Sequence, residues 1–142
     1  MDRVPSATRP WVSALTPPVT TGFGSVLIVD DNPINLLLLE EFFRLRGRES
    51  VRSACTVREA LALAREEPPL AILLDLHLPD GSGLDLLAWL RADPRLRHVP
   101  VAVVSASHDE AAHQAALALG ARAWWPKPLD LPALDERLEE LY

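Results

Sequence analysis

The sequence contains a single cysteine, Cys55, among 142 residues. One cysteine excludes an intramolecular disulfide framework and any metal site built from several thiolates, and we expect Cys55 to be a small buried hydrophobic residue. No apolar run approaches the roughly 20 residues that cross a bilayer. The N-terminus carries Arg3 but lacks the apolar core of a secretory signal. These absences predict a cytoplasmic protein that does not associate with a membrane.

Basic residues are in a minority. The chain has 14 lysine and arginine residues against 20 aspartate and glutamate residues, which gives a net charge of −6. Because nucleic-acid backbones bind clusters of Lys and Arg, we expect no direct contact with nucleic acid. The length indicates one domain with its own core, and 49% apolar and 24% charged residues are typical of a globular protein.

The first 24 residues have a different composition from the rest of the chain. They contain four prolines among Ser, Thr and Gly, without helical or alternating periodicity, which is typical of an extended arm or linker. A fully solvated linker has little use for Trp11, Val12 and Leu15. Two alternatives follow: the arm packs on the domain or on a neighbouring copy, or it is an unpacked linker. We therefore divide the chain into an arm, 1–24, and a domain, 25–142.

Five short apolar runs alternate with helical segments from residue 25 onward. This alternation predicts an α/β fold, and continuous apolar runs are typical of parallel strands buried on both faces. We predict the flavodoxin-like strand order 2-1-3-4-5 with five flanking helices, which places strands one and three side by side. The predicted strands are 25–30, 50–54, 70–75, 99–104 and 121–126.

Helix ends are marked by local sequence signals. Asn32 before Pro33 predicts a capped helix start. Capping boxes are predicted at 56–59 (Thr56 with Glu59) and at 107–110 (Ser107 with Glu110). Asp130 precedes the last helix, and Gly120 lies where the preceding helix should end.

Polar residues follow four of the predicted strands. Asp30 and Asp31 follow the first strand, Asp75 ends the third, Ser105 follows the fourth and Lys127 follows the fifth. Because the carboxyl ends of parallel strands meet at one sheet edge, these side chains should lie together, where open α/β sheets bind ligands. Taken alone, each residue could have an ordinary structural role, as a helix cap, a turn residue, a loop hydroxyl or a surface lysine. Their joint occurrence at four strand ends favours a functional site.

Three neighbouring carboxylates repel one another strongly. A divalent cation together with Lys127 would neutralise them, and an oxygen-only ligand set favours Mg²⁺ over zinc. An aspartate beside such a metal can act as a nucleophile on a phosphoryl group. Lys127 and the Ser105 hydroxyl could then stabilise the transferred charge.

Four motifs occur in an order that resembles a known family. The segment 25–142 resembles a response-regulator receiver domain of two-component signalling. The matching motifs are Val-Asp-Asp-Asn-Pro-Ile-Asn (29–35), Leu-Asp-Leu-His-Leu-Pro-Asp-Gly-Ser-Gly (74–83), Val-Ser-Ala (104–106) and Gly-Ala-Arg-Ala-Trp-Trp-Pro-Lys-Pro-Leu (120–129).

The resemblance implies roles for the polar cluster. Asp75 corresponds to the phosphorylated aspartate, and Asp30 and Asp31 to the acidic pair that binds Mg²⁺ together with Asp75 and the main-chain carbonyl of His77. Ser105 corresponds to the hydroxyl that turns toward the phosphoryl group. The family lysine that contacts this group corresponds to Lys127. The implied phosphodonor is a sensor histidine kinase or a histidine phosphotransfer protein.

Four features depart from the family pattern or bear on it. Trp124 stands where the family places its aromatic switch residue, often Tyr or Phe, and plain strand packing is the alternative. Pro126 removes a backbone donor, which is tolerable if the last strand is a sheet edge. The resemblance also implies a cis peptide between Lys127 and Pro128. The side chain of His77 either influences dephosphorylation or is an ordinary exposed loop residue.

The first helix is unusually apolar. Four consecutive leucines, 36–39, are followed by Phe42, Phe43 and Leu45. This exceeds the stripe that a core-facing helix needs, so we expect a partner, a second copy or the Trp11 arm to cover it. An uncovered apolar face is the alternative, and Trp89 is a weaker candidate of the same kind.

Three functional hypotheses follow. The favoured one is a phosphorylation-controlled signalling module, a regulatory domain rather than an enzyme. A receiver that no longer switches and serves as a docking or dimerisation scaffold is the second. The third, an Asp-nucleophile phosphohydrolase similar to haloacid-dehalogenase-like enzymes, is disfavoured because residues two positions after Asp30 and Asp75 are Asn32 and His77, not Asp.

Overall fold

The structure is a computed structural model that describes residues 24–142. Five parallel strands form one sheet in the order β2-β1-β3-β6-β7, which confirms the predicted order 2-1-3-4-5. The predictions for the N-terminal arm lie outside the described residues, apart from Gly24. The strands of this sheet are β1 (Ser25–Val29), β2 (Ser50–Ala54), β3 (Ala71–Leu74), β6 (Val101–Ser105) and β7 (Ala123–Pro126).

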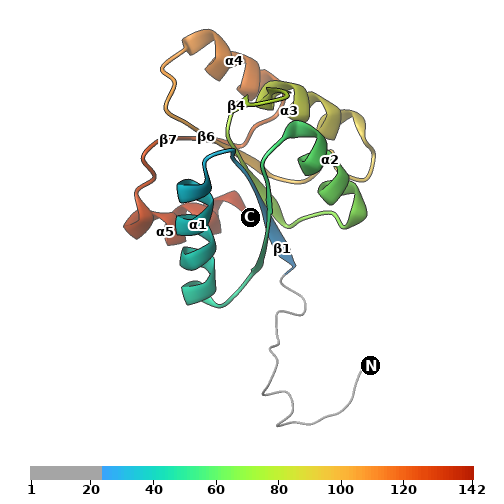
Figure 1. Cartoon of the computed structure of the whole chain (residues 1–142). Coiled ribbons are helices and arrows are strands. Elements are labelled where there is room, and N and C mark those ends of the chain that lie inside the picture. The colour runs from blue at the N-terminus through green and yellow to red at the C-terminus, as the bar shows by residue number, and fades with distance from the viewer. Residues whose placement is uncertain (1–23) are drawn as a thin grey trace.

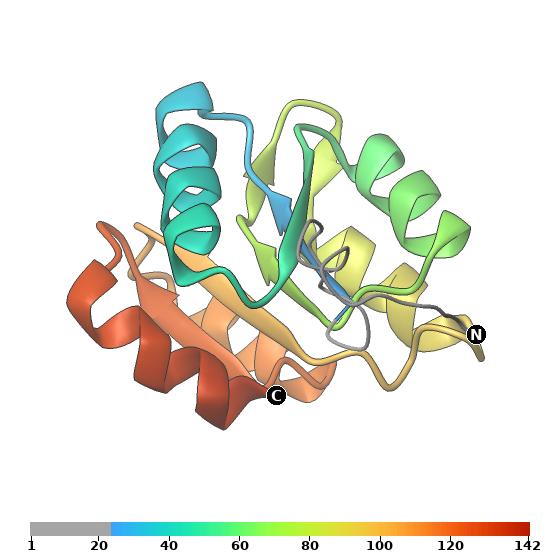
Figure 2. The same ribbon diagram turned by 90° about the horizontal axis from the view of Figure 1, so that it is seen from below.

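The five predicted helices are present and cover both faces of the sheet. Helices α1 and α5 lie on one face, and α2, α3 and α4 lie on the other (Figure 1, Figure 2). Within residues 24–142, no helix has the length and apolar character needed to cross a membrane. The helices are α1 (Pro33–Arg46), α2 (Val57–Glu66), α3 (Gly83–Ala92), α4 (Glu110–Ala118) and α5 (Leu131–Leu141).

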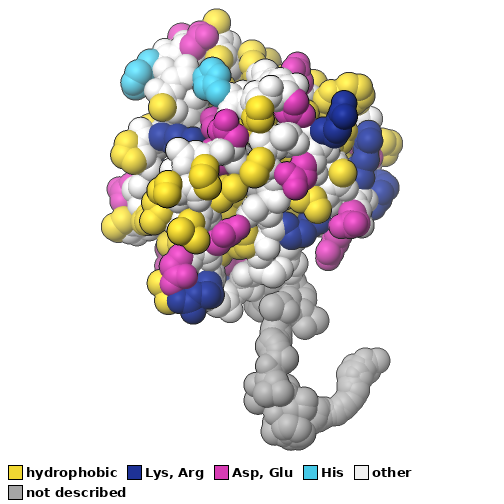
Figure 3. Space-filling model, in the orientation of Figure 1, with side chains coloured by type: hydrophobic (Ala, Val, Ile, Leu, Met, Phe, Trp, Pro, Cys, Tyr) yellow, Lys and Arg dark blue, Asp and Glu magenta, His cyan; other side chains and the backbone are white. Residues whose placement is uncertain are grey.

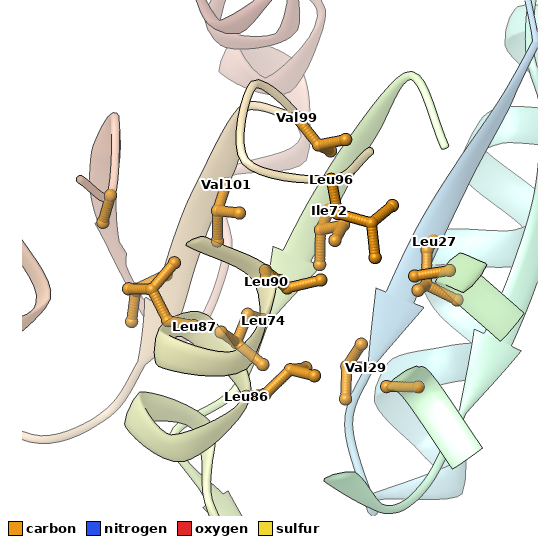
Figure 4. Close-up of a cluster of buried hydrophobic side chains, with 14 of the residues drawn as sticks. Leu27, Val29, Ile72, Leu74, Leu86, Leu87, Leu90, Leu96, Val99 and Val101 are labelled. Atoms are coloured by element: carbon orange, nitrogen blue, oxygen red, sulfur yellow. The ribbon is translucent and has the colours of Figure 1, made fainter. Parts of the chain in front are cut away.

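Alternate strand residues enter two separate cores. Leu27, Val29, Ile72 and Leu74 pack against α2, α3 and α4, as Figure 4 shows for these residues and the leucines of α3. Their neighbours Val26, Ile28 and Leu73 belong to a second core with α1 and α5. Both faces of the sheet are therefore buried at the inner strands, which is the physical reason that β1, β3 and β6 are nearly continuous apolar runs without alternation.

Most helix-end predictions are confirmed. Asn32 Oδ1 accepts a hydrogen bond from Ile34 N at 2.9 Å, with Pro33 in the first helical position. The Thr56 hydroxyl accepts a hydrogen bond from Glu59 N at 3.0 Å. The Glu59 carboxylate, however, accepts from Cys55 N rather than from Thr56 N. Gly120 has a φ of 90° just after α4.

The predicted capping box at Ser107 is wrong. Helix α4 begins at Glu110, and its N-cap is Asp109, whose carboxylate accepts from Ala111 N at 2.9 Å. The Ser107 hydroxyl instead accepts from Asp109 N at 3.0 Å. A polar turn therefore precedes the helix, and the stronger acceptor two residues later takes the capping position.

Two further findings differ from the predictions or were not predicted. Cys55 is exposed, because it follows the edge strand β2 and lies outside the cores. A two-stranded hairpin of β4 (His77–Leu78) and β5 (Gly81–Ser82) follows the third sheet strand. Strands of two residues are too short to leave a periodic pattern. As expected, β7, which carries Pro126, is an edge strand of the sheet. The peptide bond between Lys127 and Pro128 is cis, as the family resemblance implied.

Candidate functional site

Strand register brings the acidic residues together. Val29 of β1 pairs with Leu74 of β3, so the next residues, Asp30 and Asp75, leave adjacent strands at the same level. One carboxylate oxygen each of Asp30, Asp31 and Asp75 lie within 4.8 Å of one another. Asp30 and Asp75 are buried, whereas Asp31 is exposed. The cluster that the sequence predicts therefore exists at the carboxyl edge of the sheet.

Lys127 joins this cluster from the end of β7. Its Nζ donates to Asp30 Oδ2 at 2.9 Å and to Asp75 Oδ2 at 3.2 Å. Burial by itself lowers the pKa of Lys127, but the hydrogen bonds and charges of Asp30 and Asp75 outweigh it and raise that pKa. The ammonium is thus held in its charged form between the two buried carboxylates.

Backbone and amide donors orient the two buried carboxylates. Asp30 Oδ1 accepts from Asn32 N at 2.9 Å, and Asp30 Oδ2 also accepts from Asn35 Nδ2 at 3.2 Å. Asp75 Oδ1 accepts from His77 N at 3.3 Å. Asn35 belongs to the first motif, but the sequence analysis assigned it no role. A polar residue in the first turn of an otherwise leucine-rich helix was the available signal.

The donor set fits a hard divalent cation. The candidate ligands are carboxylate oxygens, and three carboxylates face a single ammonium, which leaves the cluster with excess negative charge. Asp31 has no hydrogen-bond partner among the described residues, so its oxygens are available to a ligand. Oxygen ligands and excess negative charge are what Mg²⁺ prefers in proteins.

Ser105 lies beside the cluster without contacting it. Its side chain is buried, and its Oγ accepts from Ser107 N at 3.0 Å rather than bonding to a described carboxylate. The main-chain carbonyl of Ser105 accepts from Lys127 N at 3.0 Å. The serine and the lysine are therefore coupled through the backbone of neighbouring strands.

Trp124 does not lie among the polar residues. It packs at the margin of the core under α2, α3 and α4, and its ring stacks on His113 of α4 with centroids 4.5 Å apart. The adjacent Trp125 is buried in the other core. The contacts of Trp124 in this structure are thus packing contacts, as in the alternative interpretation of this residue. No sequence pattern indicated His113 as its partner.

The segment after Asp75 is tightly packed against the start of α3. Gly83 N donates to Leu76 O at 2.8 Å, and a Cβ placed on Gly83 would lie 2.5 Å from Asp75 O. Only glycine fits such a close approach of two main chains. The exposed His77 lies in this segment, so its position is set by backbone packing.

An apolar cavity opens beside the acidic cluster. It has a volume of about 310 Å³ and lies between α1 and the segment that joins β7 to α5, with Leu38, Leu129 and Leu131 in its wall. Beyond it, α1 exposes further apolar side chains, and Figure 3 shows hydrophobic residues gathered over this helix. Four large residues of α1 are more than half exposed: Ile34 (62%), Leu37 (62%), Leu38 (51%) and Leu45 (71%).

The chain is similar to proteins of known family. The polar-differentiation response regulator DivK of Brucella ovis is 37% identical over 115 residues, which cover 81% of this chain and 93% of DivK. The chemotaxis protein CheY4 of Vibrio cholerae superposes with a TM-score of 0.79 at 25% identity, covering 85% of this chain and 100% of CheY4. The Mn²⁺-bound form of response regulator Rcp1 has a TM-score of 0.72 at 25% identity and covers 82% and 90% of the two chains.

The sequence profile of the response regulator receiver domain matches residues 26–139, which span nearly all of α5 and the sheet except for Ser25. This range contains the acidic cluster, Ser105 and Lys127. The chain therefore belongs to the response-regulator receiver domains of two-component signalling, a regulatory family rather than one of classical enzymes.

Proposed function

We propose that residues 25–142 form a phosphorylation-dependent receiver in which Asp75 accepts a phosphoryl group. The observation that carries this proposal is the position of Asp75, buried at a strand end, next to two further carboxylates and 3.2 Å from the Lys127 ammonium. Phosphoryl transfer depends mainly on positioning and charge stabilisation, and this arrangement provides both.

The transfer step conserves atoms and charge. A carboxylate oxygen of Asp75 attacks the phosphorus of a phosphohistidine, and the new O–P bond forms as the P–N bond to the imidazole breaks. The imidazole nitrogen keeps the electron pair of the broken bond and takes up a proton. Lys127 stabilises the phosphoryl oxygens by charge, because its Nζ already lies between Asp30 and Asp75.

Asp30, Asp31 and Asp75 would hold Mg²⁺, with the main-chain carbonyl of His77 as a further ligand. Bound Mg²⁺ would supply neutralisation of the carboxylates and of the phosphoryl oxygens. The oxygen-only cluster and its excess negative charge support this assignment, as does the Mn²⁺-bound state of the similar Rcp1.

Switching would follow from the new charge. We expect the Ser105 hydroxyl to give up its hydrogen bond with Ser107 N and turn toward the phosphoryl group together with Lys127. Trp124 would respond as the aromatic switch residue, which requires release of its stacking on His113. Moving a two-state switch from 1:99 to 99:1 requires about 5.5 kcal/mol, which a few charge-assisted contacts can provide.

A sensor histidine kinase or a histidine phosphotransfer protein is the proposed phosphodonor. Leu38, one of the exposed apolar residues of α1, lines the cavity beside Asp75, so this helix is the proposed contact surface for the donor or for a second copy. Residues 1–24 remain assigned to an arm outside the receiver.

The test is phosphorylation by acetyl phosphate with Mg²⁺, followed by intact mass spectrometry. We expect the wild-type protein to gain one phosphoryl group and Asp75→Asn to gain none. Asp85→Asn is a matched control at the start of α3 and should be modified like the wild type. Modification of Asp75→Asn, or none of the wild type, would contradict the proposal.

A non-switching scaffold is the second candidate, supported by the exposed apolar face of α1. Light scattering with and without beryllofluoride and Mg²⁺ separates the two. A switching receiver changes its oligomeric state or its tryptophan fluorescence on adding the phosphoryl mimic. A scaffold shows neither change.

A further inference from the structure

The first amides of α2 are capped from two directions. The initial N–H groups of a helix have no partner within it and need external acceptors. Glu59 N donates to the Thr56 hydroxyl, the local N-cap. Val57 N and Arg58 N donate instead to the carboxylate of Asp80, at 2.8 and 3.1 Å. Both carboxylate oxygens of Asp80, which is more than 20 positions away in the sequence, thus accept hydrogen bonds from the start of this helix.

Asp80 lies at the tip of the β4–β5 hairpin, which begins at His77, two residues after Asp75. The base of this segment is held by Asp75 N bonding to Val29 O and by Gly83 N bonding to Leu76 O. Between those points, β4 and β5 pair with each other and do not belong to the main sheet. The two Asp80 bonds therefore tie the tip of the hairpin to a neighbouring element.

The same hairpin carries His77. Its amide donates to Asp75 Oδ1, and its residue pairs with Ser82 across the hairpin. A shift of the hairpin would therefore move both the donor that orients Asp75 and the His77 carbonyl. The amide bonds also lower the pKa of Asp80, so its carboxylate stays ionised and a strong acceptor near neutral pH.

We propose that Asp80 is a positioning residue for the metal site: it anchors the hairpin on the N-terminus of α2 and thereby sets the main chain of His77. This inference rests on the proposed function, because it concerns the His77 carbonyl as a ligand. Groups that orient metal ligands from outside commonly change metal affinity by tenfold or more when removed.

A helix cap with no influence on the site is the competing explanation, and Thr56 provides the matched control. Thr56→Ala removes a cap from the same helix turn but leaves the hairpin attached. Asp80→Ala removes two caps and the attachment. Asp80→Asn loses the charge but keeps one acceptor oxygen, so it separates attachment from electrostatic attraction of the metal.

The experiment is calorimetric titration of each variant with Mg²⁺, together with the ¹⁵N–¹H resonance of His77 without metal. We expect Asp80→Ala to weaken Mg²⁺ binding about tenfold and to shift the His77 resonance. Asp80→Asn should show a smaller loss of affinity. Thr56→Ala should lower the unfolding midpoint while leaving Mg²⁺ affinity and the His77 resonance unchanged.

The outcomes that overturn the inference are distinct from those that overturn the proposed function. Equal Mg²⁺ affinity in Asp80→Ala and Thr56→Ala, or an unmoved His77 resonance, would reduce Asp80 to a helix cap. Equal weakening in Asp80→Asn and Asp80→Ala would assign the effect to charge and also overturn the inference. Absence of Mg²⁺ binding in the wild type would instead overturn the proposed metal site itself.

Discussion

Two ionic clusters lie at opposite ends of α1, and their charges are arranged differently. The edge cluster, at the start of the helix, consists of Asp30, Asp31, Asp75 and Lys127. The α1–α5 cluster, at its end, joins that helix to α5 and consists of Arg46, Arg48, Glu49, Asp135, Glu139 and Tyr142. Helices α1 and α5 share one face of the sheet in Figure 2.

In the α1–α5 cluster, two arginines face three carboxylates, and every carboxylate contacts an arginine. Arg46 Nε bonds to both carboxylate oxygens of Glu49, at 3.0 and 3.2 Å, and its other nitrogens reach Asp135 and Glu139. The Tyr142 hydroxyl donates to Glu49, whose side chain is only 1% exposed. A buried ion pair with every partner present links elements without calling for a ligand.

In the edge cluster, by contrast, one carboxylate has no cation partner among the described residues. Three carboxylates share one ammonium, and only two of them contact it. Mutual repulsion in the folded protein is relieved when a cation binds, so the imbalance favours binding at a cost in stability. The two clusters thus differ in one respect: each carboxylate of the structural α1–α5 cluster contacts a cation, whereas Asp31 of the edge cluster contacts none among the described residues.

The largest expected effect comes from breaking the α1–α5 cluster. Glu49→Gln leaves the buried Arg46 guanidinium without its buried charged partner, which should lower the free energy of unfolding by about 3 kcal/mol. Urea denaturation measures this change. Glu41→Gln is the control, because its pair with Arg44 lies on the exposed side of the same helix and should matter little. Equal effects of the two substitutions would remove the structural role of the cluster.

A cation should stabilise the edge cluster and have no comparable action at the other end of α1. At ten times its dissociation constant, Mg²⁺ should raise the free energy of unfolding by about 1.4 kcal/mol. Thermal melts with and without Mg²⁺ test this. Asp31→Asn should lose most of the gain, whereas Glu49→Gln should keep it. If Asp31→Asn gains as much as the wild type, the metal binds elsewhere.

Removing a carboxylate charge should change the free energy of unfolding in opposite directions in the two clusters. Asp75→Asn relieves repulsion while keeping an oxygen for the His77 amide, so without metal it should stabilise the fold by roughly 1 kcal/mol. Denaturation in the presence of a chelator measures the change. Destabilisation by Asp75→Asn would mean that its ion pair with Lys127 outweighs the repulsion.

The smallest effect concerns alkaline pH. Burial, followed by the hydrogen bond and charge of Glu49, raises the pKa of Tyr142 above its ordinary 10.0. Because folding favours the protonated phenol, this contribution to stability is complete below pH 10.0 and is lost as pH rises above it. Lys127, whose raised pKa starts from 10.5, adds a loss in the same alkaline direction.

Tyr142 is the only tyrosine of the chain, so tyrosinate absorbance reports on it alone. We expect ionisation to coincide with loss of the far-ultraviolet circular dichroism of the folded protein. Tyr142→Phe should show a weaker alkaline loss of stability, with the Lys127 share remaining. A tyrosinate transition near pH 10.0 with native dichroism would contradict the assigned burial.

Much of the fold and the site follows from local sequence. Parallel strands buried on both faces are mostly apolar, so the strand segments are recognisable in the sequence, and their order follows from the common topology of alternating α/β chains. Asp30, Asp75 and Lys127 are recognisable because strand ends in a parallel sheet meet at one edge. The predictions that Cys55 is buried and that a Ser107 capping box begins α4 were wrong. An edge position in the sheet and the choice between competing polar caps depend on neighbouring segments, not on the local sequence alone.

The amino-acid sequence by itself determined the strand segments and the residue types at the carboxyl edge of the sheet, because these depend on patterns within single segments. Tertiary structure alone decided which distant groups complete the local ones. Asp80 caps α2, Arg46 reaches α5, and Trp124 stacks on His113. Each of these contacts joins two different elements of the fold, and only three-dimensional packing sets the distance between them.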